Sequence, residues 1–275
     1  MTGKQKKQFW GMVQVILILV AVFVMLVPII WITLAAFKSH VDVYQLKLLF
    51  KPTLENFSVV FDDPYRLGDK LYNSTIVASV SVLFAIPIAT LAAYSFSRFT
   101  LKGETVMLVI ILATQFVPAV VIILPFFVMF RDIGILDTRI GLILVNLAMI
   151  MPFAIWMIKG FIDGIPLDTE EAALVDGSSR VQVIRNIVLP MAAPGLLTSA
   201  IFCFIIAWNE FLFALILTNK HAVTLPIGLA LFKAEEGDLW NLLSAAGIII
   251  MAPMFVLALL IRKYFVQGMT MGAVR

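Results

Sequence analysis

The chain has 275 residues, of which 62% are hydrophobic and only 13% are charged, and its mean hydropathy is +1.04. A soluble domain of this length cannot bury that much apolar surface, so the composition excludes a soluble protein and predicts a chain that lies in a membrane. The formal net charge of +3 is too small and too scattered to indicate nucleic-acid binding.

Six apolar stretches each approach the ~20 residues that a helix needs to cross a bilayer. They cover residues 12–37, 74–96, 106–130, 140–158, 196–217 and 242–261. The sequence therefore predicts an all-α, polytopic membrane protein with six transmembrane helices in one domain over residues 1–275, and both termini on one side. The first apolar run is longer than the core of a signal peptide, so we interpret it as an uncleaved span.

Basic residues give only a slight indication of orientation. Of the 20 Lys and Arg residues, eleven fall on the side of the N-terminus and nine on the other side. The positive-inside rule therefore favours cytoplasmic termini, but by a narrow margin.

A polar segment at residues 159–190 separates the fourth and fifth apolar stretches. Thr169 is a candidate cap for a short exposed helix that ends at Asp176 and Gly177. The acidic pair Glu170 and Glu171 suits the positive end of that helix dipole. The small and apolar residues of the helix are suited to docking in a partner's cleft; they are Ala172, Ala173, Leu174 and Val175.

A second helix is predicted to start at Ser178 or Ser179 and to run to about Val188. Pro190 follows and is expected to mark the boundary with the next apolar stretch.

The order of residues in this segment resembles the EAA loop of ATP-binding cassette importer permeases. Seven identities stand in register, namely Glu171, Ala172, Ala173, Gly177, Ile187, Leu189 and Pro190. The resemblance implies that the loop forms a coupling helix seated in a groove of an ATPase subunit. The residues implied in this coupling are Glu170, Glu171, Ala172, Ala173, Leu174, Asp176, Gly177, Ile187, Leu189 and Pro190. The alternative is an ordinary amphipathic cytoplasmic loop, which needs helix formers and a turn but not this spacing.

Glu210 is predicted to lie near the middle of the fifth span, beside Trp208 and Asn209. An ionisable side chain at that depth costs ~2.5 kcal/mol or more and normally faces a bundle interior or a water-filled path. Two interpretations stay open: these residues line a substrate path or gate, or Glu210 and Asn209 hydrogen-bond across a subunit interface.

Further stretches narrow the resemblance to the carbohydrate-uptake branch of importer permeases, of the type of the smaller maltose permease subunit. They are residues 152–156, 189–195, 208–211 and the ending 268–275. The resemblance implies that the cytoplasmic tail, about 262–275, reaches the ATPase through Gly272, Ala273, Val274 and Arg275. The tail lacks the final glycine usual in that branch and has Arg in place of Lys. The alternative is a positively charged cytoplasmic anchor.

The resemblance implies a permease subunit of an ATP-driven importer for a sugar or polyol in a bacterial or archaeal cell membrane. Its implied partners are a second homologous permease, two ATPase subunits that bind ATP-Mg, and an extracytoplasmic solute-binding protein.

The chain has no phosphate-binding Gly-rich loop and no metal-ligand spacing, so we expect no cofactor, metal or catalytic residue in it. An ion-coupled secondary transporter or channel, with Glu210 as the ion carrier, is the main alternative. A membrane enzyme is a third, disfavoured because no acid, base and nucleophile cluster is present.

Overall fold

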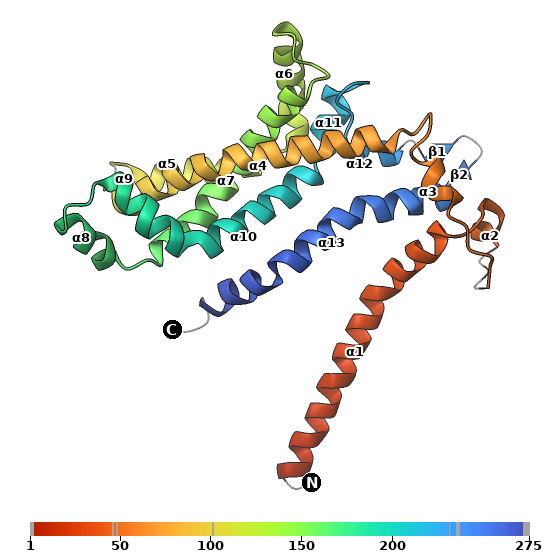
Figure 1. Cartoon of the computed structure of the whole chain (residues 1–275), viewed down its shortest axis with the longest axis horizontal. Coiled ribbons are helices and arrows are strands. Elements are labelled where there is room, and N and C mark those ends of the chain that lie inside the picture. The colour runs from red at the N-terminus through yellow and green to blue at the C-terminus, as the bar shows by residue number, and fades with distance from the viewer. Residues whose placement is uncertain are drawn as a thin grey trace. The chain divides into compact units, whose positions relative to one another are not determined.

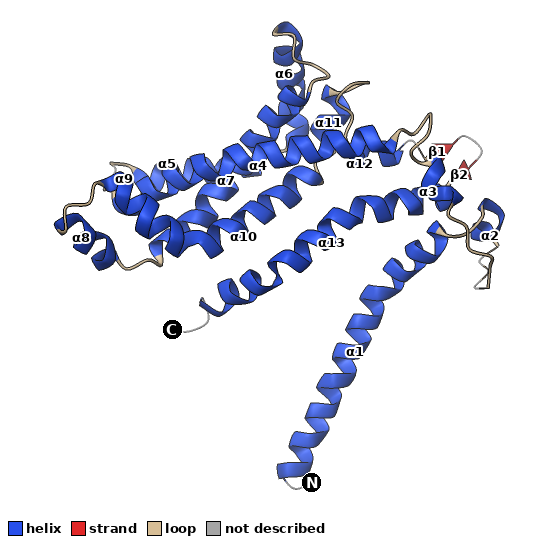
Figure 2. Ribbon diagram, viewed as in Figure 1, coloured by secondary structure: helices blue, strands red, loops and turns tan. Residues whose placement is uncertain are grey.

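A computed structural model describes residues 3–45, 47, 49–100, 102–230, 232–234 and 237–271 of the chain (Figure 1). These residues form helices, apart from connecting turns and one antiparallel pair of two-residue strands (Figure 2). The chain divides into two compact units: unit 1 is Met1–Leu67 with Leu229–Ala252, and unit 2 is Gly68–Gly228 with Pro253–Arg275.

Unit 1 holds two long helical segments, two short helices and the strand pair. They are α1 (Gly3–Ala36), α2 (His40–Tyr44), α3 (Glu55–Val59), β1 (Lys233–Ala234), β2 (Gly237–Asp238) and the first part of α13 (Trp240–Met271). A buried amide links three of these elements. The Asn56 Nδ2 atom donates to the carbonyl oxygens of Ala36 and Lys38, and the Asn56 Oδ1 atom accepts from Asn241 Nδ2 at 2.7 Å. This amide thereby joins the end of α1 to α3 and to the start of α13.

Unit 2 contains most of the remaining helices. They are α4 (Leu67–Arg98, whose first residue belongs to unit 1), α5 (Glu104–Ala113), the 3₁₀ turn η1 (Thr114–Phe116), α6 (Ala119–Asp132), α7 (Arg139–Asp163), α8 (Leu167–Val175), α9 (Arg180–Val183), the π-helical turn η2 (Ile184–Val188), α10 (Leu189–Trp208) and α11 (Leu212–Leu217). The short helix α12 (Leu225–Ala230) runs across the boundary between the units.

Five helices of the described chain are long and apolar enough to cross a membrane, and a bent pair of helices makes a sixth candidate. The five are Phe9–Ala36, Leu67–Arg98, Arg139–Asp163, Arg180–Trp208 and Trp240–Leu259, and the pair is Glu104–Phe116 with Ala119–Asp132. The predicted all-α membrane fold is confirmed.

The prediction of a continuous third span over residues 106–130 is wrong. The two helices of the pair meet at a bend of 91°. Val117, which precedes Pro118, has an extended backbone with ψ 118°. A proline removes a backbone donor and disfavours the helical conformation of the residue before it, so the helix ends here.

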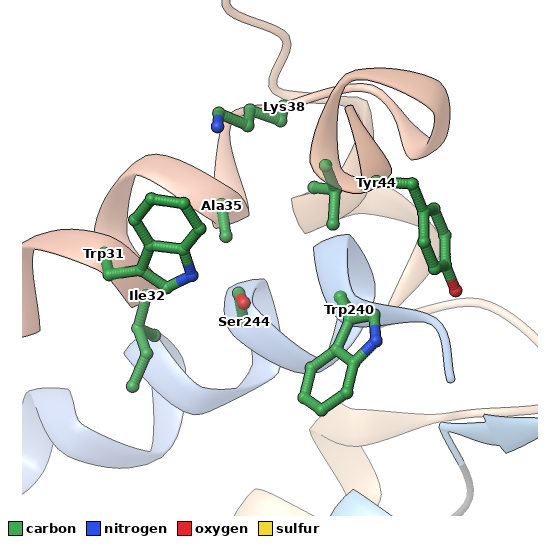
Figure 3. A pocket seen from close by; sticks show the side chains of 8 residues that line it. Trp31, Ile32, Ala35, Lys38, Tyr44, Trp240 and Ser244 are labelled. Carbon is green, nitrogen blue, oxygen red and sulfur yellow. The ribbon is translucent and has the colours of Figure 1, made fainter. Parts of the chain in front are cut away.

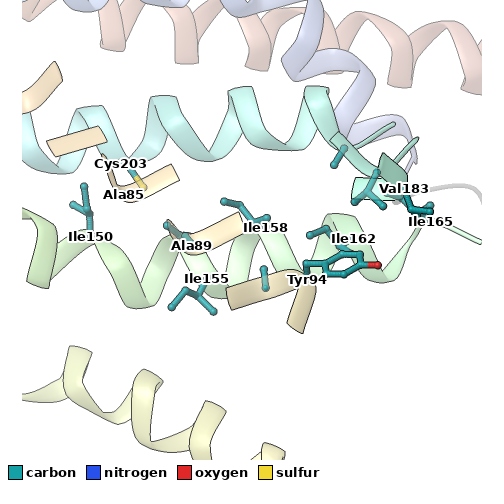
Figure 4. Packing of buried hydrophobic residues seen from close by; sticks show 14 residues of the cluster. Ala85, Ala89, Tyr94, Ile150, Ile155, Ile158, Ile162, Ile165, Val183 and Cys203 are labelled. Atoms are coloured by element: carbon teal, nitrogen blue, oxygen red, sulfur yellow. The ribbon is translucent and has the colours of Figure 1, made fainter. Parts of the chain in front are cut away.

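The core of unit 2 forms where α4, α7 and α10 pack together (Figure 4). Ala85, Ala89 and Ala93 recur every four residues on α4 and are fully buried. Their small side chains let the helix backbones approach closely, and the branched side chains of α7 fill the space opposite. Those side chains are Ile150, Ile155, Ile158 and Ile162.

Candidate functional site

The predicted coupling segment forms two short helices, α8 and α9, which lie together at one end of unit 2 (Figure 1). Helix α8 starts at Leu167, with Pro166 in the capping position. The prediction that Thr169 caps this helix is therefore wrong. Pro166 has φ −59°, and because a proline ring fixes a backbone angle compatible with a helix start, the helix begins one turn earlier.

Gly177 ends this segment in the way that the sequence predicts. Its φ is +91°, and its N–H donates to the carbonyl oxygen of Leu174, while the N–H of Ser178 donates to that of Ala173. This is a Schellman arrangement, in which a residue with positive φ closes the last turn of a helix. Apart from its two neighbours in the chain, no described residue has an atom within 4 Å of a Cβ built on Gly177, so the glycine is needed there for its backbone conformation.

The residues predicted to dock on a partner divide between two faces of α8. Glu171, Ala172, Val175 and Asp176 are exposed, and the exposed fraction of Val175 is 87%. Ala173 and Leu174 are half-buried and pack against the core of unit 2. The apolar residues of α8 thus lie on two sides of the helix. Ala173 and Leu174 pack it against the core of unit 2, and Ala172 and Val175 stay accessible.

Glu170 is buried, with an exposed fraction of 1%. Its Oε1 atom accepts a hydrogen bond from Arg98 Nε at 2.7 Å, and its Oε2 atom accepts one from the Tyr94 hydroxyl at 3.0 Å. The expectation of an entirely exposed helix is therefore wrong at this position. A carboxylate can be buried when an opposite charge and further hydrogen bonds compensate for its lost hydration.

Arg98 also joins α8 to the end of α7. Its Nη2 atom donates to the carbonyl oxygens of Ile162 at 2.9 Å and Ile165 at 3.0 Å. Three segments, the C-terminal ends of α4 and α7 and the first turn of α8, therefore meet at one guanidinium group. Arg98 and Tyr94 were not predicted as site residues; the one indication in the sequence was that Arg98 is a basic residue directly after an apolar stretch.

The second helix of the segment starts as predicted but does not stop where predicted. Ser179 caps it in a capping box with Gln182. The helix then continues through η2 into α10, so Pro190 lies inside one long helix and its role as a boundary is wrong. The π-helical turn directly before Pro190 offers the reason, because a wider turn accommodates a residue that lacks an N–H. Ile187, Leu189 and Pro190 lie in this continuous helix rather than on α8.

The predicted tail residues Gly272, Ala273, Val274 and Arg275 lie outside the described residues.

Glu210 lies in a break between α10 and α11, which corrects its predicted place within a continuous span. Its Oε1 atom accepts from the N–H of Phe213 at 2.7 Å and its Oε2 atom from that of Ala214 at 3.0 Å. The carboxylate thus satisfies backbone donors that the first turn of a helix leaves without partners. The two neighbours point elsewhere: Trp208 is buried and stacks on Phe204, while Asn209 is exposed and donates to the carbonyl of Ile205.

A second carboxylate holds the opposite end of α11. Asp137, in the turn between α6 and α7, accepts hydrogen bonds from the N–H groups of four consecutive residues, Asn219, Lys220, His221 and Ala222. Burial raises the pKa of Asp137, but these backbone donors outweigh that effect and hold the pKa below its ordinary value of 3.8. No local sequence pattern indicates this contact, since the partners lie more than 80 residues away.

A cavity of about 400 Å³ lies beside the bend between α5 and α6. Thr114 and Gln115 from the bend line it, together with Phe126 of α6, Met149 of α7 and Phe213 of α11. Non-helical backbone at membrane depth is tolerated where it lines a cavity or packs on protein.

These features define a polytopic, all-α membrane protein in which the short helix α8 presents an exposed face. Comparisons with known proteins agree. The family model described as "Binding-protein-dependent transport system inner membrane component" matches residues 85–271. The chain belongs to this family and is a multi-pass inner-membrane permease subunit of an ATP-binding cassette transporter, not itself the ATPase.

Two relatives and one solved structure illustrate the similarity. The chain is 36% identical over 260 residues to the probable ABC transporter permease protein y4oR of Sinorhizobium fredii, covering 93% of this chain and 92% of that protein. It is 35% identical over 254 residues to the trehalose/maltose transport system permease protein MalG of Thermococcus litoralis, covering 91% of each. A chain from the crystal structure of a bacterial transporter for the acidic polysaccharide alginate superposes with a TM-score of 0.77 at 25% identity, covering 94% of this chain and 98% of that one.

Proposed function

We propose that this permease imports a sugar or related carbohydrate and forms half of a translocation pathway with a second, homologous permease. The similarity to the trehalose/maltose and alginate permeases supports the carbohydrate class. Its further partners are two ATPase subunits, which bind ATP-Mg, and an extracytoplasmic solute-binding protein.

The proposal rests mainly on the two different sides of helix α8. One side of this helix is fastened to the membrane domain through Glu170 and Arg98, and its outer side presents Glu171, Ala172 and Val175. We assign the outer side to the groove of the ATPase, and the coupling loop to about residues 159–190. ATP-driven closure of the ATPase dimer then brings two such helices together, and the spans alternate between inward-open and outward-open states.

The other predicted residues take secondary roles in the proposal. Gly177 sets the end of α8. Ile187, Leu189 and Pro190 lie in the helix that connects the coupling loop to the next span. The cytoplasmic tail, about 262–275, contacts the ATPase through Gly272, Ala273, Val274 and Arg275. Trp208, Asn209 and Glu210 adjoin the substrate path, with Glu210 fixing the position of α11 beside the cavity at the bend.

Cytoplasmic termini follow from a docking helix that must meet a cytoplasmic ATPase. The test uses cysteines at two exposed sites, Ser179→Cys and Asp63→Cys, in a Cys203→Ser background. The thiol reagent cannot cross the inner membrane, and it is added to cells whose outer membrane or wall has been permeabilised while the inner membrane stays intact. It is expected to label only the Asp63→Cys variant. Labelling of Ser179→Cys from outside contradicts the orientation.

The substrate is tested by purifying the assembled complex and screening solutes, each with the binding protein, for stimulation of ATP hydrolysis. The proposal predicts stimulation by a carbohydrate. Stimulation only by amino acids, peptides or inorganic ions contradicts it.

A further inference from the structure

Unit 1 contains a cavity of about 410 Å³ (Figure 3). It is formed by the end of α1, by α2 and by the start of α13. The residues that line it are Trp31, Ile32, Ala35, Lys38, Val43, Tyr44, Trp240 and Ser244. Figure 3 shows Trp31 and Lys38 on one side of the cavity and Trp240 on the other.

Lys38 is the unusual member of this lining, because its exposed fraction is only 2%. Its Nζ atom lies 5.1 Å from the ring centroid of Trp31 and 5.2 Å from that of Phe50. Cation–π contacts of this kind compensate only part of the cost of burying an ammonium group. A negative group in the cavity would compensate the rest.

The carboxylate of Asp42, on α2, is already engaged. Asp42 accepts hydrogen bonds from the Ser39 hydroxyl at 2.9 Å and from Lys47 Nζ at 3.3 Å. Within the described part of the chain, Lys38 forms no ion pair with a carboxylate. Among the described residues, none supplies an anion that pairs with Lys38, so the cavity can accept an anion from outside.

The position of the cavity indicates which anion this is. Lys38 follows the span Phe9–Ala36, and Trp240 begins the span Trp240–Leu259. Both spans end at the level of the cavity, so it lies at the boundary between membrane and water. Trp and Tyr side chains are enriched at this level, and here Trp31, Tyr44 and Trp240 line the cavity. The anion that a bilayer presents at this depth is the phosphate of a phospholipid headgroup.

We propose that this cavity binds the headgroup of an anionic phospholipid, with its phosphate against Lys38 and its acyl chains along α1. The most apolar 18 residues of α1 have no buried members, so the helix offers the acyl chains a continuous apolar surface below the headgroup. A headgroup with a net negative charge, such as that of phosphatidylglycerol, is preferred over a zwitterionic one because the choline cation is repelled by Lys38. This inference does not depend on which solute the permease imports.

The test compares lipid retention by the purified transporter complex in native mass spectrometry, with phosphatidylglycerol and phosphatidylcholine of matched acyl chains. The wild type is expected to retain phosphatidylglycerol preferentially. Lys38→Met keeps much of the side-chain volume without the charge and is expected to lower that preference about fivefold, which corresponds to ~1 kcal/mol for one lysine near the membrane surface. Lys47→Met, which removes a neighbouring but exposed lysine, is the matched control and is expected to leave the preference unchanged.

Ser244→Leu provides a second variant, since it fills the cavity without touching Lys38 and is expected to lower the preference as well. Three results would overturn the proposal. Equal effects of Lys38→Met and Lys47→Met would indicate general surface electrostatics. Loss of the partner permease from the Lys38→Met complex would assign the lysine to a protein carboxylate. Displacement of the bound lipid by millimolar glycerol phosphate would indicate a site for soluble phosphates.

Discussion

The Arg98 guanidinium and the Glu170 carboxylate form a buried ion pair, with 2.7 Å between Nε and Oε1 and side-chain exposures of 6% and 1%. The same guanidinium donates to the carbonyl oxygens of Ile162, in the last turn of α7, and of Ile165, just after that helix. A displacement of α8 cannot therefore occur without moving the ends of α4 and α7 or separating a buried pair. If α8 docks on an ATPase as proposed, this contact transmits its movement to the spans.

Removing one partner of this pair is expected to cost about 3–5 kcal/mol of unfolding free energy, because it leaves the other charge buried and uncompensated. Arg98→Leu and Glu170→Ala should both show the loss in an SDS-unfolding titration of the purified permease. Glu171→Ala, which changes the neighbouring exposed residue, is the matched control and should unfold like the wild type while weakening ATPase retention. Equal stability of the Glu170→Ala and Glu171→Ala variants would show that the pair does not hold α8.

Gly177→Val should release the ATPase from a correctly inserted permease. A β-branched residue at φ +91° is strained by about 1–2 kcal/mol, and nothing else contacts the position, so the change acts on the end of α8 alone. Co-purification of the ATPase with the tagged permease measures the effect. Gly160→Ala, at an open helical position of α7 without positive φ, is the control and should retain the ATPase. Full retention by Gly177→Val would count against the docking role of α8.

Asp137→Asn should loosen the segment that follows α11 in a pH-dependent way. The folded state lowers the pKa of Asp137, so its contribution to stability is fully present above the ordinary value of 3.8 and is lost as the pH falls through the lower, folded value. The midpoint difference between wild type and Asp137→Asn in thermal unfolding should thus be largest near neutral pH and shrink below about pH 4. Asp132→Asn, an exposed neighbour, serves as the control. A difference that does not change with pH would mean that the charge of Asp137 is unimportant.

Glu210→Ala should destabilise α11 by roughly 0.5–2 kcal/mol, the range for removal of a helix cap. Glu210→Gln keeps one acceptor oxygen for the N–H of Phe213 or Ala214 and should assemble normally, yet alter substrate-stimulated ATP turnover. Thr198→Val controls for local disturbance of α10, since the Thr198 hydroxyl donates to the carbonyl oxygen of Pro194 in the preceding turn. Unchanged turnover in Glu210→Gln, together with failed assembly in Glu210→Ala, would assign Glu210 to structure alone.

The sequence predicts this molecule best where local chemistry decides the structure. Apolar stretches of span length predict the helices, and the positive φ of Gly177 and the cap at Ser179 follow from their neighbours. Pro118 and Pro190 show the limit of local rules: the first ends a helix and the second does not, because a π-helical turn accommodates it.

The contacts of the carboxylates could not be predicted from the sequence. Glu170 meets Arg98 across 72 residues, and Asp137 meets the segment after α11 across more than 80. The packing of the helices decides which residues become such partners, and local sequence patterns do not predict this packing. No proline marks the break at Glu210. There the Glu210 carboxylate accepts hydrogen bonds from the N–H groups of Phe213 and Ala214, in the first turn of α11.

Uptake of labelled sugar into proteoliposomes tests whether this chain is the permease of an ATP-driven carbohydrate importer. We predict uptake only when the complete complex, the binding protein and ATP inside the vesicles are all present, and its loss in the Glu171→Lys variant, which reverses a charge at the start of α8. Sugar uptake by this chain alone, driven by an ion gradient and unaffected by Glu171→Lys, would contradict the account.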